Sequence, residues 1–348
     1  MIRAAYDVTA LGDSLHGGIA QVCYQTLLAA DQHPDIAADG FYRANRPAEN
    51  LKEEVPLRKL GLTTGWRVKP FDIVHGLCHR LPRLRGGRTV YTLHDVWSLY
   101  PNKYQSAGFQ KKIGPRMRRE LIAADCIITD SETTRDNLLN LDLVLPEKVH
   151  VSHLGVTMPA TEVGIHPDTD ITEAIGDRYV LFVGRLEYRK NLPHVIEAVR
   201  EMPSMHLVLV GEPGFGYDEV KMHLAQMDSD RLHLFDQISD VQMADLYSNA
   251  VATLLPSWEE GFGLPILEAM SHGSPVITCD RSASAEVAGQ AAVLVDPTDP
   301  AASRDAIIRM LDDSEFRSML IAAGRERAAG FTWVLYFERV VEVYESIL

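Results

Sequence analysis

Short apolar runs alternate with segments of helical periodicity along the whole chain of 348 residues. Apolar runs between turn signals are typical of buried strands, and apolar positions spaced by a helical turn predict amphipathic helices. Alternating strands and helices indicate βαβ units, and hence an α/β fold with mostly parallel sheets. The predicted strands are 2–8, 35–41, 72–76, 88–94, 125–130, 148–153, 178–184, 206–211, 231–235, 251–255, 275–279 and 291–295. The predicted helices include 18–30, 107–123, 191–201, 217–227, 240–249, 264–272, 300–313, 314–329 and 334–347.

The length of the chain favours two domains, because a single hydrophobic core rarely grows beyond roughly 250–300 residues. Residues 157–174 are polar, contain two prolines and show no sustained period, so we expect them to connect the domains. Each half then holds one doubly wound domain. We place the first domain at 1–160 and the second at 161–332.

Composition is that of a soluble globular protein, with 46% hydrophobic and 24% charged residues. No segment approaches the roughly eighteen uninterrupted apolar residues that a transmembrane helix needs. The N-terminus meets Asp7 too early for the apolar core of a signal peptide, so we expect a cytoplasmic protein. Four widely spaced cysteines lack the pairing of zinc or redox motifs and are expected to be reduced, mostly buried thiols: Cys23, Cys78, Cys126 and Cys279.

Charge is distributed unevenly along the chain. The net charge of −14 argues against nucleic acid as a partner. Residues 80–119, here called the basic window, contain ten basic residues and one acid, Asp95. The window is either a solvated face or an acceptor-side patch that attracts pyrophosphate or the anionic lipids of the inner membrane face. Its basic residues are Arg80, Arg83, Arg85, Arg88, Lys103, Lys111, Lys112, Arg116, Arg118 and Arg119.

Two carboxylates, Glu260 and Glu268, lie around a glycine turn that opens a helix. Pro265 suits the first helical turn, which puts Glu260 on the loop and Glu268 about one turn into the helix. Gly261 and Gly263 let a ligand approach the backbone, and the first free N–H groups of the helix favour a phosphate. The carboxylates instead accept hydroxyl protons, as ribose and hexose diols require. The turn therefore indicates a sugar-nucleotide site; the alternative is a solvated loop residue and a helix-face residue.

Arg185 and Lys190 follow Gly184 at the end of a predicted strand, the edge where open α/β sheets bind ligands. Arginine grips phosphate oxygens with its planar fork, and lysine acts as a point charge. A departing nucleoside diphosphate gains negative charge, so such cations favour the transition state over the ground state. The alternative is a pair of exposed loop charges. Arg189, next to Lys190, has no assigned role.

Four more residues stand out in the first half, at a strand end or a helix start. Gly17 and Gly18 form a glycine turn at a helix N-terminus. His94 ends the strand 88–94, where a lone histidine is either structural or part of a site. Ser131 is expected to cap a helix.

Taken together, these motifs resemble the retaining glycosyltransferases of family 4, and the resemblance covers nearly the whole chain. It implies the GT-B fold: two doubly wound Rossmann-like domains facing each other across a cleft, with a C-terminal helix at 333–348 that crosses back to the first domain. One departure is Ala285, where the family often has proline. The segments that carry the resemblance are 183–191, 210–212, 257–270, 275–277 and 285–289.

The resemblance also implies roles. Glu268 would bind the ribose hydroxyls, Glu260 a donor-sugar hydroxyl, and Arg185 and Lys190 the diphosphate, while His94 would lie close to the donor sugar. The predicted catalytic residues are thus His94, Arg185, Lys190 and Glu260. The predicted donor-binding residues are Gly17, Gly18, Gly184, Arg185, Lys190, Gly261, Phe262, Gly263, Leu264 and Glu268.

The implied activity is retaining transfer of a hexose from a nucleotide diphosphate sugar to an acceptor hydroxyl. The stretch 93–101 looks like the His-Asp segment of bacterial mannosyltransferases in this family, which favours GDP-mannose over a UDP-sugar. The acceptor would be a glycan or a lipid-linked glycan in O-antigen or other cell-surface polysaccharide assembly. Neither a cofactor nor a metal is expected, because the two Asp-x-Asp runs, 168–170 and 228–230, look like solvated turns.

Other functions stay open at this point. A UDP-sugar-dependent transferase could act on a soluble sugar or protein. A GT-B epimerase or phosphorylase would share the donor site, although a pyridoxal phosphorylase would need a committed cofactor lysine. A catalytically silent sugar-nucleotide-binding scaffold subunit is the alternative from another class of protein.

Overall fold

The computed structural model describes residues 1–12, 17–43, 57–60, 70–78, 80–82, 84, 86–158, 175–176 and 178–348. These residues form two compact units, one of Met1–Gly155 with Thr332–Leu348 and the other of Val156–Phe331. The outgoing and returning chains meet at this boundary: the Val156 amide donates to the Phe331 carbonyl over 2.9 Å. A Cβ on Gly155 would lie 2.2 Å from the Trp333 nitrogen, which requires glycine there. The first unit therefore ends before the predicted boundary at 160.

Within its described residues, the first unit is built on a parallel sheet in the order β3-β2-β1-β4-β5-β6-β7. The order turns back between β1 and β4, as in doubly wound folds. β3 was not predicted, because its sequence, Leu-Arg-Lys-Leu, is short and half basic, as suits an edge strand. The strands are β1 Ile2–Asp7, β2 Ile36–Arg43, β3 Leu57–Leu60, β4 Ile73–Gly76, β5 Arg88–Leu93, β6 Cys126–Thr129 and β7 Val149–Val151.

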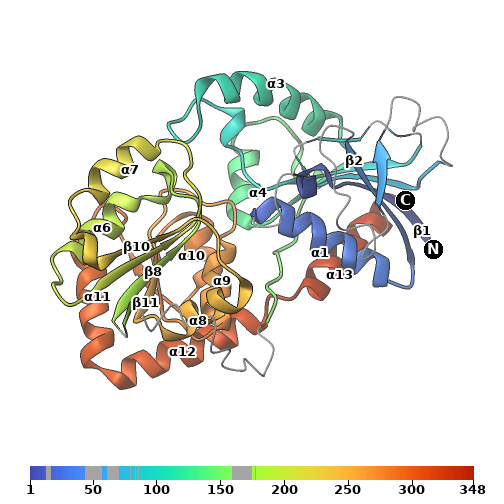
Figure 1. Ribbon diagram of the computed structural model, residues 1–348. Coiled ribbons are helices and arrows are strands. Elements are labelled where there is room, and N and C mark those ends of the chain that lie inside the picture. The colour runs from blue at the N-terminus through green and yellow to red at the C-terminus, as the bar shows by residue number, and fades with distance from the viewer. Residues whose placement is uncertain are drawn as a thin grey trace. The chain divides into compact units, whose positions relative to one another are not determined.

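The helices of the first unit include α1 (Gly18–Gln32), α3 (Ala107–Ala123) and α4 (Glu132–Leu139). Ser131 caps α4, since its hydroxyl accepts the Thr134 amide over 3.0 Å, and this prediction is confirmed. Helix α13 (Trp333–Ile347) returns to this unit from the far end of the chain and packs beside α1 (Figure 1).

Buried polar contacts join α13 to the sheet. Tyr344 hydrogen-bonds His75 of β4 over 2.7 Å, and the other ring nitrogen of His75 meets Thr92 of β5 over 2.7 Å. Burial, and to a lesser extent the nearby His94, lowers the pKa of His75 to about 3, so the imidazole is neutral at physiological pH. Ser152 donates to the Tyr336 carbonyl over 2.9 Å. The predicted return of the C-terminal helix to the first domain is confirmed.

The second unit is built on a parallel sheet in the order β10-β9-β8-β11-β12-β13, which turns back between β8 and β11. Every described strand of this unit was predicted; the central strands, from β9 to β12 in this order, are nearly continuous apolar runs because they are buried on both faces. The strands are β8 Tyr179–Val183, β9 His206–Val210, β10 Leu232–Phe235, β11 Ala252–Leu255, β12 Val276–Cys279 and β13 Val293–Val295. The helices include α6 Leu192–Arg200, α7 Tyr217–Leu224, α8 Asp240–Asn249, α9 Leu264–Ser271, α10 Ser282–Ala288, α11 Pro300–Asp312 and α12 Ser314–Ala329.

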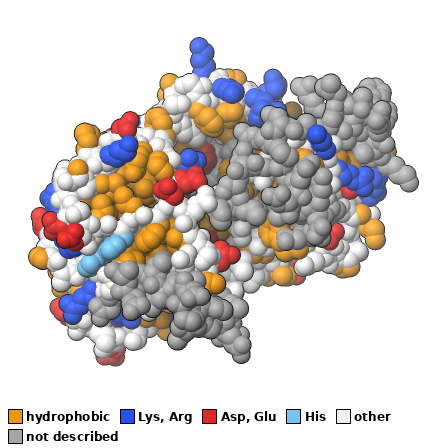
Figure 2. Space-filling model, viewed as in Figure 1, with side chains coloured by type: hydrophobic (Ala, Val, Ile, Leu, Met, Phe, Trp, Pro, Cys, Tyr) orange, Lys and Arg blue, Asp and Glu red, His pale blue; other side chains and the backbone are white. Residues whose placement is uncertain are grey.

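Much of the basic window lies on the outer face of α3. Lys111, Lys112, Arg118 and Arg119 are exposed there, and Figure 2 shows Lys and Arg side chains along this edge of the surface. Arg116 is half-buried and pairs with Glu120 over 3.6 Å. Two other residues of the window, Arg83 and Arg85, lie outside the described residues.

Two further expectations can be compared with the fold. Of the helices that are described, none combines the length and apolar character needed to span a membrane. The four cysteines are free thiols, and all except Cys78 are buried, as predicted.

Candidate functional site

The predicted site residues of the second unit follow the two strands that flank the turning point of its sheet. Gly184, Arg185 and Lys190 come after β8, and the loop to Glu260 comes after β11. Ligands bind at such points because neighbouring strands send their loops apart and leave a crevice at the carboxyl edge of the sheet. The fold thus brings together residues that are about 75 positions apart in the sequence.

Glycines make the first of these loops compact. Gly184 and Gly211 have φ angles of 138° and 149°, in the region that favours glycine. A Cβ on Gly211 would lie 2.1 Å from the Gly184 carbonyl oxygen, so the ends of β8 and β9 could not pack this closely with any other residue. This contact explains the glycine of the segment 210–212.

Glu260 is the centre of a cluster of charges. Its Oε1 accepts from the Lys190 ammonium over 2.5 Å and from the Ser257 hydroxyl over 2.7 Å. Its Oε2 accepts from Arg189 over 2.8 Å. The second guanidinium nitrogen of Arg189 donates to Glu187 over 2.6 Å. The side chains of Arg189, Lys190 and Glu260 are each only 11% exposed, so water screens these ion pairs weakly.

The cluster holds Glu260 in its charged form. Burial alone would raise its pKa, but the charges of Arg189 and Lys190, with hydrogen bonds from Lys190 and Ser257, lower the pKa of Glu260 to about 2. The side chain is therefore an ionised acceptor throughout the physiological range, which suits it to accept a hydrogen bond from a hydroxyl.

Glu268 lies in a different environment on α9. The Tyr247 hydroxyl of α8 donates to its Oε2 over 3.0 Å, and His272 stacks on the Tyr247 ring with centroids 5.4 Å apart. Burial raises the pKa of Glu268, and the Tyr247 hydrogen bond opposes this rise. Tyr247 therefore fixes one carboxylate oxygen of Glu268.

The glycine turn before α9 adopts the expected form. Gly263 precedes α9 with a φ of 109°, and Pro265 lies in the first turn, as predicted. The Phe262 side chain is buried and packs edge-on against Phe331, with ring centroids 6.0 Å apart. A ligand could therefore meet Phe262 only through its backbone. Leu264 begins the helix.

A small hollow connects these elements. Its lining contains three of the predicted residues, Lys190, Glu260 and Gly263, together with Leu255, Pro265, Ile266 and Ser284. Arg185 lies elsewhere, with its side chain exposed to solvent and donating weakly to the Pro213 carbonyl over 3.4 Å. The two cations of the predicted diphosphate site thus differ: Lys190 is paired and buried, and Arg185 is exposed at the same strand end.

In the first unit, Gly17 and Gly18 are exposed at the start of α1. A Cβ on either residue would meet no described atom within 4 Å. Packing within the described structure therefore does not require glycine here, and the close approach of a ligand remains a reason for it.

Two hydrogen bonds hold the His94 ring in place. Its Nδ1 donates to Asp130 over 2.6 Å, and its Nε2 donates to the Leu77 carbonyl over 2.9 Å. Burial lowers its pKa, but the ion pair with Asp130 outweighs this and raises the pKa of His94 to about 9. The ring is therefore an imidazolium with both nitrogens engaged. Contact with a donor sugar would require the hydrogen bond to Leu77 to be exchanged.

Three partner residues were not assigned from the sequence: Arg189, Tyr247 and Asp130. For Asp130 a signal existed, because it ends a predicted strand next to that of His94, and Leu93 pairs with Thr129 across β5 and β6. Nothing in the pattern around Tyr247 separates it from an ordinary buried tyrosine. The sequence places Arg189 next to Lys190, but the contacts of its side chain are needed to give it a role.

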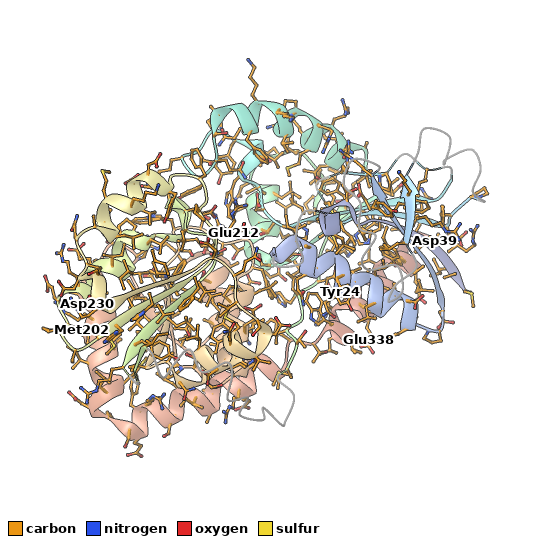
Figure 3. The ribbon with its side chains drawn as sticks, viewed as in Figure 1. Tyr24, Asp39, Met202, Glu212, Asp230 and Glu338 are labelled. Carbon is orange, nitrogen blue, oxygen red and sulfur yellow. The ribbon has the colours of Figure 1, made fainter. Side chains whose placement is uncertain are left out.

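One Asp-x-Asp run can be located. Residues 228–230 begin a turn before β10, where Asp228 pairs with Arg231 over 3.2 Å and Asp230 lies at the surface (Figure 3). The prediction of a solvated turn is confirmed for this run, while 168–170 lies outside the described residues. Among the side chains that the structure describes, no three His, Cys, Asp or Glu converge as a metal site would require.

Comparison with protein families gives matches over both units. The model described as glycosyl transferases group 1 matches residues 169–327, and the model described as glycosyltransferase family 4 matches residues 18–158.

Curated relatives match at modest identity. O-antigen chain mannosyltransferase B of Escherichia coli is 27% identical over 294 residues, which cover 81% of this chain and 77% of that protein. D-inositol 3-phosphate glycosyltransferase 1 of Catenulispora acidiphila is 29% identical, with 94% of this chain and 87% of that protein covered.

Solved structures share the fold. Sucrose-phosphate synthase of Thermosynechococcus elongatus has a TM-score of 0.76 at 21% identity, covering 99% of this chain and 98% of its own. HepE of Anabaena, solved in complex with UDP-glucose, has a TM-score of 0.77 at 17% identity, covering 99% and 100%.

Proposed function

The chain belongs to the group 1 glycosyltransferases of family 4, with the GT-B fold, and from that premise we propose that it is a retaining hexosyltransferase that uses a nucleoside diphosphate sugar. The observation that carries the proposal is the hollow at the turning point of the second sheet. There a buried cation, Lys190, and an ionised acceptor, Glu260, stand beside the glycine turn that opens α9. The cation and the helix N-terminus suit a phosphate, and the ionised carboxylate suits a sugar hydroxyl.

In this proposal the donor is held at three points. Glu268 accepts from the ribose hydroxyls, Glu260 accepts from a hydroxyl of the hexose, and the diphosphate lies near Lys190, Arg185 and the first N–H groups of α9. The bond between the anomeric carbon and the diphosphate oxygen breaks, and that oxygen takes the electron pair. The acceptor oxygen bonds to the anomeric carbon on the same face and gives its proton to the leaving phosphate. Lys190 and Arg185 stabilise the charge that develops there.

The activity is tested by the release of free nucleoside diphosphate from a nucleotide sugar, with and without a panel of soluble sugars and lipid-linked glycans. We expect release that depends on an acceptor. Release at the same rate without acceptor would indicate a hydrolase, and binding without release in any condition would indicate a silent scaffold subunit.

For the donor we propose GDP-mannose. Support comes from the His94-Asp95 segment and from the similarity to a mannosyltransferase, whereas HepE was solved with a UDP-sugar. A thermal-shift panel of GDP, UDP and ADP separates the bases, because a ligand at about a hundredfold its Kd adds roughly 2.7 kcal/mol to stability. Stabilisation by UDP alone would replace GDP-mannose with a UDP-sugar.

For the acceptor we propose a lipid-linked glycan, met by the exposed basic face of α3. Each Lys or Arg near an anionic surface contributes about 1 kcal/mol, and salt weakens the attraction. We expect sedimentation with phosphatidylglycerol vesicles at low salt but not with phosphatidylcholine vesicles. Binding should be lost when five residues are neutralised together: Lys111, Lys112, Arg116, Arg118 and Arg119. Equal binding by this variant would leave the basic window as a solvated face and favour a soluble acceptor.

A further inference from the structure

Arg189 joins the loop after β8 to the loop after β11. Its carbonyl accepts the Trp258 amide over 2.9 Å, and one guanidinium nitrogen donates both to the Glu259 carbonyl over 2.6 Å and to Glu260 Oε2 over 2.8 Å. The other terminal nitrogen donates to Glu187 over 2.6 Å. The guanidinium presents donors from separate nitrogens of one rigid plane, whereas the lysine ammonium donates from a single nitrogen, so lysine could replace just part of this arrangement.

The contacts of Glu260 are divided between its two oxygens. Oε1 already accepts two hydrogen bonds, from Lys190 and Ser257, while Oε2 accepts one from Arg189. A carboxylate offers about four acceptor positions, two on each oxygen. Counting the contacts of the described residues, the acceptor position that is left for a sugar hydroxyl is therefore on Oε2, the oxygen to which Arg189 donates.

Arg189 itself does not reach the hollow. Among the described residues, the lining includes Lys190 and Glu260 but not Arg189. Its side chain is 11% exposed, and its guanidinium donates to Glu260, which does line the hollow. Of the described residues to which Arg189 donates, Glu260 is the one that lines the hollow, so we expect an effect of Arg189 on a donor to pass through Glu260.

We propose that Arg189 is a positioning residue that aims Glu260 Oε2 at a hydroxyl of the donor hexose and keeps the carboxylate in place when the Lys190 ammonium engages the diphosphate. This inference rests on the proposed function, since it assigns Glu260 to the sugar. Arg189 then determines how much better a nucleotide sugar binds than the corresponding nucleoside diphosphate. The affinity for the diphosphate itself depends little on Arg189.

Calorimetry tests this without an acceptor. Dissociation constants for GDP and GDP-mannose, and for UDP and UDP-glucose, give for each protein a ratio of nucleotide sugar to nucleoside diphosphate affinity. A hydrogen bond to a charged group corresponds to roughly a tenfold or larger change in affinity. We therefore expect Arg189→Met to lower the ratio about tenfold and to change the affinity for the diphosphate less than threefold. Arg189→Lys should restore part of the ratio.

A double-mutant cycle with Glu260→Gln separates positioning from a general structural role. If Arg189 acts through Glu260, then Arg189→Met changes the ratio less than twofold once Glu260→Gln is present. Arg200→Met is the matched control, since Arg200 pairs with Gln226 on the surface of the same unit over 2.6 Å and should leave the ratio unchanged. Circular dichroism establishes whether each variant is folded. If Arg189→Met is not folded, Arg189→Lys replaces it in the cycle.

The possible failures can be told apart. A wild-type protein that binds neither sugar nucleotide, or a Glu260→Gln variant with an unchanged ratio, would overturn the proposed role of Glu260 and this inference with it. A ratio that falls in Glu260→Gln but stays constant in Arg189→Met would overturn the inference alone. An equal fall caused by Arg189→Met in both backgrounds would also overturn it, because Arg189 would then act independently of Glu260.

Discussion

The charge cluster around Glu260 makes a quantitative prediction about stability and pH. The pKa of Glu260 is about 2 in the folded protein, against an ordinary value of 4.5. Because the folded value is the lower one, the ionised carboxylate stabilises the fold above about pH 5, and this stabilisation is lost as the pH falls toward 2. One unit of pKa difference corresponds to about 1.4 kcal/mol. Ionised Glu260 therefore contributes about 3 kcal/mol to the free energy of unfolding at pH 7 and about 1 kcal/mol at pH 3.

The perturbation is Glu260→Gln, which keeps the shape of the side chain and removes its charge. We expect the wild-type protein to exceed this variant in free energy of unfolding by about 3 kcal/mol at pH 7 and by about 1 kcal/mol at pH 3. Urea unfolding of both proteins, followed by fluorescence and circular dichroism across this range, measures the difference. All other carboxylates titrate in both proteins, so the pH dependence of the difference isolates Glu260.

The control is Glu132→Gln, at an exposed pair in which Arg135 donates to Glu132 over 3.0 Å. An exposed pair of this kind contributes roughly 0–1 kcal/mol, so the control should unfold close to the wild type at both pH values. Two results would refute the reasoning: a Glu260→Gln difference that stays constant from pH 7 to pH 3, or no difference at pH 7. Either would mean that Arg189 and Lys190 do not stabilise the charge of Glu260.

Three predictions concern activity. Arg185→Ala and Lys190→Ala should each lower kcat at least tenfold while the circular dichroism spectrum is kept, and unchanged turnover in both would remove the diphosphate assignment. Glu268→Gln should weaken binding of the free nucleoside diphosphate about tenfold, Tyr247→Phe less, and Glu260→Gln hardly at all; calorimetry giving the reverse order would exchange the ribose and sugar roles. Turnover should persist in excess EDTA, and a loss that magnesium or manganese restores would contradict metal independence.

Most of the fold could be predicted because its central strands are buried on both faces. Such strands are short apolar runs that stand out from the helices between them, as at Tyr179–Val183 and Val276–Cys279. The edge strand Leu57–Leu60 was not predicted, because two of its four residues are basic. Whether a strand lies at the edge of a sheet depends on how the sheet assembles, so the hydrophobic pattern of its own residues does not predict it.

The candidate site could be predicted in part, for a related reason. Glu260 and Lys190 stand at ends of predicted strands, and the resemblance to a family gave them roles. Their relation to Arg189 depends on where side chains point after the loops have packed. Tyr247 illustrates the limit: its hydroxyl meets Glu268 across 21 positions of sequence, from one helix to another, and no periodicity encodes that contact.

Each of the two units has a buried ion pair at the carboxyl edge of its sheet. In the first, the imidazolium of His94 at the end of β5 is paired with Asp130 at the end of β6 over 2.6 Å. In the second, Lys190 after β8 is paired with Glu260 after β11 over 2.5 Å. In each case a buried cation at a strand end is held by a carboxylate from a neighbouring strand of the same sheet, which offsets the cost of burying its charge.

Such pairing has a consequence for chemistry. A buried unpaired cation would shift its pKa or draw water into the site, whereas a paired one is already oriented before a ligand arrives. Of the two cations predicted to bind the diphosphate, Arg185 is the exposed one, at the same strand end as Lys190, so its charge is available to attract a diphosphate from solution. In the proposed mechanism Arg185 would first attract the donor, and Arg185 and Lys190 together would stabilise the leaving group once the donor is bound.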